Sequence, residues 1–260
     1  MYKKVILPVL LLLISICGTA KDYKVTSPDG RIMVVVAKDE QVKWKVTYDG
    51  KELINSPVIA MEMTTGTIPA EKDRIRKGPV KKVSESIIPV VPVKRSEVKS
   101  EYNILEILFS SGSVLEFRAY NDGVAYRFRT ASEGEVTVLN ETSEIHFPPG
   151  TKSWYPLEES FMSHNERIFI PSLADTLVSK HLASLPALFQ VSGTNVLITE
   201  SDIDDYPGMW LRGEGNGKFR AVWPQYPEKE ALMQDRNLFI TSTKDYIAVT
   251  KGTRSFPWRV

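Results

Sequence analysis

The segment LITESDIDDYPGMW, residues 197–210, combines a strand, an acidic loop and a turn, and it decides how the second half of the chain folds. Asn195–Ile198 is a short apolar run of the kind that forms a buried strand. Glu200 follows it closely, and the turn dipeptide Pro207-Gly208 ends the loop. The pattern predicts that Glu200 stands at the end of a core strand, where a rigid scaffold presents ligand-binding groups. A solvated hairpin turn is the alternative interpretation of the same residues.

Strand patterns continue on both sides of this segment. Val42–Tyr48 alternates apolar and polar residues, and Asp49-Gly50 after it is a hairpin turn signal. Asn121-Asp122-Gly123 separates two further strand patterns in the same way. Many short strands with frequent turns predict an all-β sandwich or barrel. The remaining predicted strands cover residues 31–37, 51–63, 102–109, 114–120, 124–130, 135–139, 144–147, 187–191, 218–223, 237–240 and 245–249.

Helical patterns are scarce, and no stretch has the composition of a linker. Glu158–His164 and Asp175–Leu185 are predicted as short helices. Residues 66–82 are polar and charged and contain two prolines and two glycines, so we predict a long exposed connection there. Residues 21–260 are therefore predicted to form one domain, which is long enough to be stabilised by its own core.

Residues 1–20 have the features of a secretory signal peptide: a basic start, an apolar run and small residues at the end. The apolar run is too short for a transmembrane helix. We expect cleavage after Ala20 and export across the inner membrane, to the periplasm or the outer surface. Cys17 is the only cysteine, and the bulky Ile16 before it argues against a lipoprotein anchor. The exported chain would then contain no disulfide.

The charge balance excludes some classes of partner. Lys and Arg number 33 and Asp and Glu number 32, which gives a formal net charge of +1. No basic stripe indicates nucleic-acid binding, and no segment after the signal peptide is long and apolar enough to span a membrane. A neutral sugar needs no strong electrostatic field, so this balance permits a carbohydrate ligand.

Several motifs besides the opening segment occur in a fixed order along the chain. They are SPDG at 27–30, FRAYNDGVAYR at 117–127, WYP at 154–156, NE at 165–166 and SFPWR at 255–259. Together they resemble the N-terminal domain of glycoside hydrolase family 97, a family of secreted α-glucosidases and α-galactosidases. The resemblance covers nearly the whole chain after the signal peptide. It implies a β-supersandwich, the two-sheet fold also found in sugar mutarotases.

In that family the supersandwich packs on a TIM-type barrel that carries the catalytic carboxylates. Residues 1–260 show no alternation of parallel strands and long helices, so we expect the barrel to be missing from this chain. The resemblance implies a carbohydrate (an α-glucoside or α-galactoside) and the barrel as partners, and we expect the chain alone to be inactive. Truncation just after Ser255–Arg259 is the expected explanation, and a stand-alone carbohydrate-binding module is the alternative.

The resemblance also implies one metal ligand. In the family the glutamate of the ITE segment helps to hold a calcium ion together with glutamates of the barrel, and Glu200 occupies that position. Calcium takes roughly six to eight oxygen ligands, so we expect it to bind only when the barrel ligands are present. Asp202, Asp204 and Asp205 do not have the spacing of an EF-hand and are predicted as solvated loop residues.

Asn165, Glu166 and Trp154 are the candidates for substrate contacts that the resemblance provides. Aromatic rings stack on the C–H face of a sugar, and polar side chains bind its hydroxyls. A core position is the alternative for Trp154. Arg118 and Arg127, in the central motif, are predicted to cover sheet edges or to pair with nearby acids.

The three histidines provide a second enzymatic hypothesis. A mutarotase uses a histidine and a glutamate as acid and base, and His164 lies two residues from Glu166. His146 falls in a strand pattern and His181 in a predicted helix, where lone histidines are usually structural. No Gly-rich phosphate loop, zinc-ligand spacing or Gly-x-Ser-x-Gly elbow occurs. We therefore assign no catalytic residue to this chain.

Overall fold

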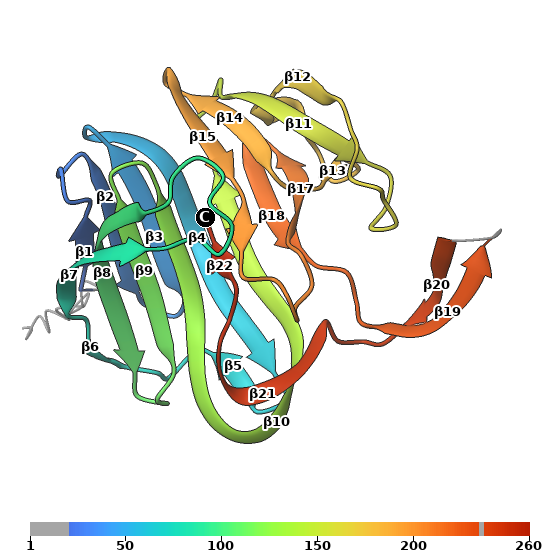
Figure 1. Cartoon of the computed structure of the whole chain (residues 1–260), viewed down its shortest axis with the longest axis horizontal. Helices are drawn as coiled ribbons and strands as arrows, with labels where there is room; N and C mark the ends of the chain where they lie inside the picture. The colour runs from blue at the N-terminus through green and yellow to red at the C-terminus, as the bar shows by residue number, and fades with distance from the viewer. Residues whose placement is uncertain (1–20, 234–236) are drawn as a thin grey trace, which may run out of the picture.

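The computed structural model describes residues 21–233 and 237–260, and they form antiparallel β-sheets packed as a sandwich (Figure 1). The predicted signal peptide, residues 1–20, lies outside the described residues. Within them the only helical element is the 3₁₀ turn η1, Ala174–Thr176. None of the described helical structure is long and apolar enough to cross a membrane. The prediction of an all-β sandwich is confirmed.

The first strands follow one another as hairpin neighbours: β1 (Tyr23–Thr26), β2 (Ile32–Lys38), β3 (Val42–Tyr48) and β4 (Lys51–Met63). In β3 the side chains of Val42, Trp44 and Val46 are buried while the residues between them are exposed. Asp49 and Gly50 both have positive φ, 48° and 77°, as the tight turn between β3 and β4 requires.

The long strand β10 (Val124–His146) joins the sheets. Its partners along its length are β9 (Val114–Tyr120), β21 (Ala248–Ser255), β22 (Trp258–Arg259), β4 and β18 (Lys218–Val222). The three strands predicted at 124–130, 135–139 and 144–147 are thus parts of a single strand. Its register shifts between Ala131 and Glu135, where an irregularity lets a strand bend from one sheet towards another.

The predicted exposed connection at residues 66–82 is wrong. The segment contains β5 (Gly66–Ile68), β6 (Ile75–Lys77) and the start of β7 (Val80–Ile87). Both β6 and β7 pair with β8 (Val98–Phe109). Seven of the eight residues of β7 are exposed, because this strand lies at the edge of the sheet. Edge strands carry charged residues that discourage further pairing, and such a composition resembles a loop.

The second half of the chain builds further sheet from β11 (Lys152–Glu158), β12 (Phe169–Leu173), β13 (Leu182–Ala183), β14 (Ala187–Val191), β15 (Thr194–Ile198), β16 (Glu200–Ser201) and β17 (Trp210–Gly215). The helices predicted at 158–164 and 175–185 are wrong. Glu158 ends β11 and residues 159–168 are irregular. After η1, the chain turns through a hydrogen bond from His181 N to Val178 O (2.8 Å) and enters β13.

The core has two aromatic centres. Trp44, Phe117 and Tyr126 bring together β3, β9 and β10, with ring centroids 5.5–5.6 Å apart. Phe219 lies 5.1 Å from Phe189 and 5.8 Å from Phe147, so it joins β18 to β14 and to the end of β10. Both centres belong to one continuous buried cluster.

One pair of strands stands apart from the sandwich. β19 (Pro227–Met233) and β20 (Asn237–Thr243) form a separate two-stranded sheet that projects from the body (Figure 1). The strand predicted at 237–240 is confirmed as part of β20. The strand predicted at 245–249 begins too early, because β21 starts at Ala248 and the residues before it lead back from the projection.

Replacing Phe219 by Ala is expected to lower the free energy of unfolding of residues 21–260 by about 3–5 kcal/mol, because it empties a fully buried site between strands. Urea unfolding followed by circular dichroism measures the change. Leu139→Ala on the exposed side of β10 is the matched control and should cost less than about 1 kcal/mol. Equal losses in the two variants would contradict the placement of Phe219.

Candidate functional site

Arg259 binds two glutamates from distant parts of the chain. Its Nη1 donates to Glu200 Oε2 at 2.7 Å, and its Nη2 and Nε donate to Glu141 Oε1 and Oε2 at 2.7 and 3.4 Å. The pairing of β16 with β22 places Glu200 directly opposite Arg259, while Glu141 comes from β10. Only 4% of the Arg259 and Glu141 side chains and 9% of Glu200 are exposed. These three residues form the buried ion triad of this domain.

The ion triad carries a surplus negative charge, since two carboxylates face one guanidinium. Burial raises the pKa of Glu200 above its usual range, although the charge of Arg259 and a hydrogen bond from Met209 N act against it. Burial alone would lower the pKa of Arg259, but Glu141 and then Glu200 outweigh it and raise the pKa. The guanidinium also lies 5.2 Å from the centre of the Trp223 ring. A cation close to Glu200 would offset the surplus charge.

The acidic loop leaves one oxygen of Glu200 partly free. Met209 N lies 2.8 Å from Glu200 Oε1 and 2.9 Å from Oε2, so the two oxygens share this donor. Oε2 also accepts from Arg259, whereas Oε1 has no further partner among the described residues. Gly208 permits the close approach, because a Cβ at that position would lie 3.1 Å from Oε1. Oε1 therefore keeps a lone pair that can bind a ligand.

The three aspartates of the loop behave differently from one another. Asp202 and Asp204 are exposed, as predicted. Asp205 is also exposed, but it accepts two hydrogen bonds from Arg254, at 2.9 and 3.2 Å. Arg254 lies 5.0 Å from the centre of the Phe256 ring, so it links the loop to the end of β21. The loop that carries Glu200 is thus attached to the sandwich at both of its ends.

The described residues fit calcium only in part. Glu200 supplies one carboxylate oxygen with a single hydrogen-bond donor, in a net-negative environment that suits a hard cation. No group of three or more His, Cys, Asp or Glu side chains in residues 21–233 and 237–260 is placed to hold a metal ion. The other ligands of a calcium ion would have to come from outside the described residues.

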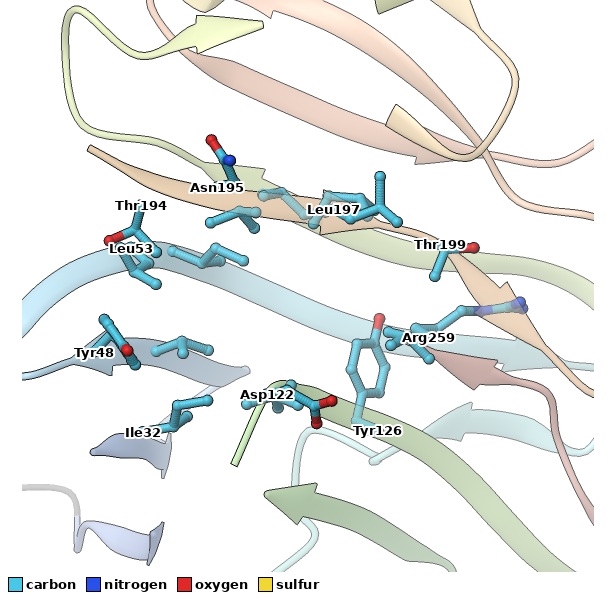
Figure 2. A pocket seen from close by; sticks show the side chains of 18 of the residues that line it. Ile32, Tyr48, Leu53, Asp122, Tyr126, Thr194, Asn195, Leu197, Thr199 and Arg259 are labelled. Carbon is cyan, nitrogen blue, oxygen red and sulfur yellow. The ribbon is translucent and has the colours of Figure 1, made fainter. Parts of the chain in front are cut away.

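A cleft of about 550 Å³ lies beside the ion triad (Figure 2). Tyr126 and Arg259 lie at one end of the cleft, and Tyr48, Leu53 and Thr194 lie at the other. Aliphatic residues of β3, β4 and β15 line much of the wall, together with the aromatic residues Trp44, Tyr48 and Tyr126 and polar residues that include Asn121, Asp122 and Asn195. The lining is thus mixed in character, and Glu200 is not among its residues.

The candidate substrate residues lie away from this cleft. Trp154 is half-buried in β11, between β12 and β14. Asn165 has a positive φ of 58° in the irregular segment after β11, and the Glu166 side chain is 88% exposed. No hydrogen bond or ion pair in the described parts of the chain connects these residues to Glu200. A role for them in binding a substrate stays a prediction.

Glu158 holds the segment that carries Asn165 and Glu166. Its buried carboxylate accepts hydrogen bonds from Ser163 Oγ (2.7 Å), Arg167 Nε (2.7 Å) and Ser184 Oγ (3.0 Å). Burial alone would raise the pKa of Glu158, but these hydrogen bonds outweigh it and lower the pKa below the usual range. The same bonds explain why residues 158–164 form no helix, since they pull the segment back onto the end of β11.

The histidines have local structural contacts. His164 Nδ1 accepts a hydrogen bond from Glu166 N (3.1 Å), and both side chains are largely exposed outside the cleft of Figure 2. His146 lies 3.1 Å from Glu144 within β10, and His181 Nδ1 accepts from Val178 N (2.9 Å) in a turn. The exposed His164–Glu166 pair lacks the enclosed pocket that acid–base chemistry on a sugar needs.

The central motif and the final motif meet on the outer face of the sandwich. Glu116 is buried there, 3.1 Å from Arg118 and 3.4 Å from Arg127. The guanidinium groups of both arginines lie over the Trp258 ring, at 4.4 and 4.1 Å from its centre. The prediction that these arginines pair with acids is confirmed. The two motifs thus stabilise the contact between β9, β10 and β22.

Two members of the ion triad were not found from the sequence. Arg259 ends a motif that we quoted, but its partners lie 59 and 118 positions away. Glu141 occurs in a polar run with no motif of its own. The register of β10 against its neighbours brings these residues together, and local sequence patterns do not specify that register.

Fold and site together define an antiparallel β-sandwich domain with a buried ion triad at the base of an acidic loop. The chain belongs to the Glycosyl-hydrolase 97 N-terminal family, whose sequence pattern matches residues 25–260. A retaining alpha-galactosidase of Bacteroides thetaiotaomicron is 28% identical over 253 residues, which is 92% of this chain and 38% of that protein. The chain thus spans well under half the length of this relative.

Solved structures share the fold. A glycoside hydrolase family 97 enzyme from Pseudoalteromonas sp. strain K8, in complex with acarbose, is 18% identical with a TM-score of 0.74, covering 91% of this chain and 35% of that one. A beta-arabinopyranosidase is 19% identical with a TM-score of 0.75, covering 92% of this chain and 39% of that one. The sandwich described above is therefore the fold found in these larger enzymes.

Arg259→Met is expected to destabilise residues 21–260 by about 3–5 kcal/mol, because it leaves two buried carboxylates without their counter-ion. Urea unfolding at neutral pH measures the loss. Arg220→Met removes an exposed ion pair with Glu214 and is the matched control, with an expected change below about 1 kcal/mol. A loss as small as that of the control would show that the ion triad does not form.

Glu158→Gln is expected to lower the free energy of unfolding at neutral pH. It should also make that free energy vary less with pH in the acidic range. Because folding lowers the pKa of Glu158, the carboxylate stabilises the fold above its ordinary pKa of 4.5, and this contribution is lost as the pH falls below that value. The difference between wild type and variant should therefore shrink from about pH 7 to about pH 3. Thermal melts across this range measure it, and a constant difference would contradict the assignment.

Proposed function

We propose that this chain works as the N-terminal domain of an α-glycosidase, where it docks on a catalytic barrel and supplies Glu200 as one ligand of a calcium ion. The observation that carries the proposal is the state of Glu200. Arg259 and Met209 hold its carboxylate, Oε1 keeps a free lone pair, and the surrounding cluster has a surplus negative charge. A side chain fixed in this way is a preorganised but incomplete metal ligand.

Residues of this chain would have separate roles around that ion. Arg259 and Met209 N fix the orientation of Glu200, while Glu141 shares the positive charge of Arg259 and so leaves Glu200 without a full counter-ion. A bound calcium ion would supply positive charge next to the reacting sugar and would help to fix the two domains relative to each other. Its remaining ligands would come from the barrel, because the described residues include no group of three or more His, Cys, Asp or Glu side chains placed to hold a metal ion.

The substrate follows from the relatives. The curated relative is named a retaining alpha-galactosidase, and one structural relative was solved with acarbose bound. We propose an α-glucoside or an α-galactoside as the substrate of the whole enzyme, in the periplasm or at the outer surface. Asn165, Glu166 and Trp154 are the residues of this domain that we propose to contact the sugar. The cleft of Figure 2 is not part of this proposal, because neither Glu200 nor any of these three residues lines it.

A stand-alone carbohydrate-binding module is the alternative function. The two hypotheses differ in the protein that the cell makes. A domain of an α-glycosidase is translated as part of a much longer chain, whereas a module is complete at about the length of residues 21–260. Reading the DNA beyond the codon for Val260, and immunoblotting the native protein, separates them. A product of the module's size, with no barrel encoded in frame or in the next gene, would reject the enzyme hypothesis.

Glu200→Gln is expected to abolish calcium binding in the enzyme while leaving the sandwich folded, because the amide keeps the shape and removes the charge. The test joins this chain to the catalytic portion of the retaining alpha-galactosidase and titrates the product with calcium by calorimetry. Wild type should bind, and its melting temperature should rise with calcium by mass action. Residues 21–260 alone should bind at best in the millimolar range, roughly that of the loosest extracellular sites.

The matched control for this titration is Asp204→Asn, which removes a neighbouring exposed charge from the same loop. It should change calcium affinity by less than about threefold, since an exposed charge is screened. Equal affinities in wild type and Glu200→Gln would reject Glu200 as a ligand. Restoration of binding by Glu200→Asp at reduced affinity would support a direct contact rather than a structural effect.

A further inference from the structure

The projecting sheet formed by β19 and β20, which we call the arm, lacks a partner for its surface. Every residue of β19 is exposed, and in β20 only Ile240 and Ser242 are half-buried. The two strands pair only with each other and form a sheet of their own (Figure 1). An isolated pair of strands is at best marginally stable in water, so the arm needs a surface to pack on.

The outer half of the arm is apolar. Leu232 and Leu238 face each other across the two strands and are 63% and 60% exposed. Ala231 and Phe239 form the next pair, on the opposite face. Among the described residues of the arm, those at the base include charged side chains, such as the ion pair of Glu228 with Lys244. Exposed apolar groups gathered at one end, with charges behind them, are typical of a surface that binds another protein.

The stem of the arm is held in place by contacts within the chain. Tyr226 N donates to Tyr246 O at 2.8 Å, and Lys244 N donates to Tyr226 O at 2.9 Å. The rings of Tyr226 and Tyr246 lie 5.4 Å apart. The arm is therefore fixed at its base while its outer half extends away from the body (Figure 1).

The arm and the loop that carries Glu200 belong to one surface. A second cleft, also of about 550 Å³, is lined on one side by Asp205, Tyr206 and Pro207 of the acidic loop. On the other side it is lined by Pro227 and Ile240 of the arm. A partner that reaches Glu200 with calcium ligands has to cover the acidic loop, and the arm stands directly beside it.

We propose that the arm is a docking element that packs its apolar outer half onto the catalytic portion of the enzyme, on the same side as Glu200. This inference rests on the proposed function. The partner that we propose for the arm is the part of the enzyme outside this domain. In the retaining alpha-galactosidase relative, the matched region is 38% of the length, which leaves 62% outside it. Burial of Leu232 and Leu238, which share one face of the arm, gives an apolar contact of the kind that dominates interface energies.

Hydrogen exchange detected by mass spectrometry tests the proposal directly. In residues 21–260 alone, the backbone amides of the arm should exchange within seconds, as in a frayed element. In the chain joined to the catalytic portion of the retaining alpha-galactosidase, they should be protected by about tenfold or more. Unchanged exchange of the arm in a joined protein that still binds calcium through Glu200 would overturn the inference and leave the proposed function intact. Loss of calcium binding together with an unprotected arm would reject both.

Variants separate docking from a general effect on folding. Leu232→Ser with Leu238→Ser should weaken association of residues 21–260 with the separately expressed catalytic portion about tenfold or more, without lowering the melting temperature of the sandwich. Val90→Ser is the matched control, because it removes a fully exposed apolar group from the segment between β7 and β8. Equal weakening by both variants would overturn the assignment. The assignment would also be overturned if residues 21–260 form a dimer that dissociates in the double variant, because the partner of the arm would then be a second copy of this chain.

Discussion

The structure depends on the buried contact of Arg259 with Glu141 and Glu200. One guanidinium connects the central strand β10, the short strand β16 and the last strand β22, at the point where the acidic loop leaves the sandwich. A buried ion cluster of this kind is costly to form and costly to break, so it specifies an arrangement rather than adding stability. Its surplus negative charge has no counterpart in the described residues, and this imbalance separates the site from an ordinary structural ion pair.

The acidic loop, the second cleft and the arm all lie near this charged site. Met209 N donates to Glu200, Gly208 lets the acidic loop approach it closely, and Arg254 binds Asp205 in the middle of the loop. These contacts attach the loop to the strands on either side of Glu200. The acidic loop and the arm line the second cleft from its two sides, so a partner that covers this cleft would meet both of them. The cleft of Figure 2 has no part in this arrangement, because neither Glu200 nor the arm lines it.

Local patterns in the sequence predicted most strands and the position of Glu200, because side-chain alternation and turn residues act over a few positions. They failed where contacts between residues far apart in the sequence determine the local structure. The edge strands β6 and β7 contain charged residues, so their composition resembles that of a loop. Hydrogen bonds to the buried carboxylate of Glu158 hold residues 159–168 in an irregular conformation where a helix was predicted. The partners of Arg259 depend on the register of a strand 23 residues long, which no local motif specifies. Of the arm, only the strand at 237–240 was predicted; β19 and the isolation of the arm from the sandwich were not.

The most direct test is a crystal structure of this domain joined to a family catalytic portion, with calcium located by its anomalous scattering. Our account predicts a calcium ion bound by Glu200 Oε1 at about 2.3–2.6 Å, with Oε2 still bound to Arg259 and the rest of the shell supplied by the catalytic portion. An ion that avoids Glu200, or a Glu200 that binds it only after leaving Arg259, would contradict the account.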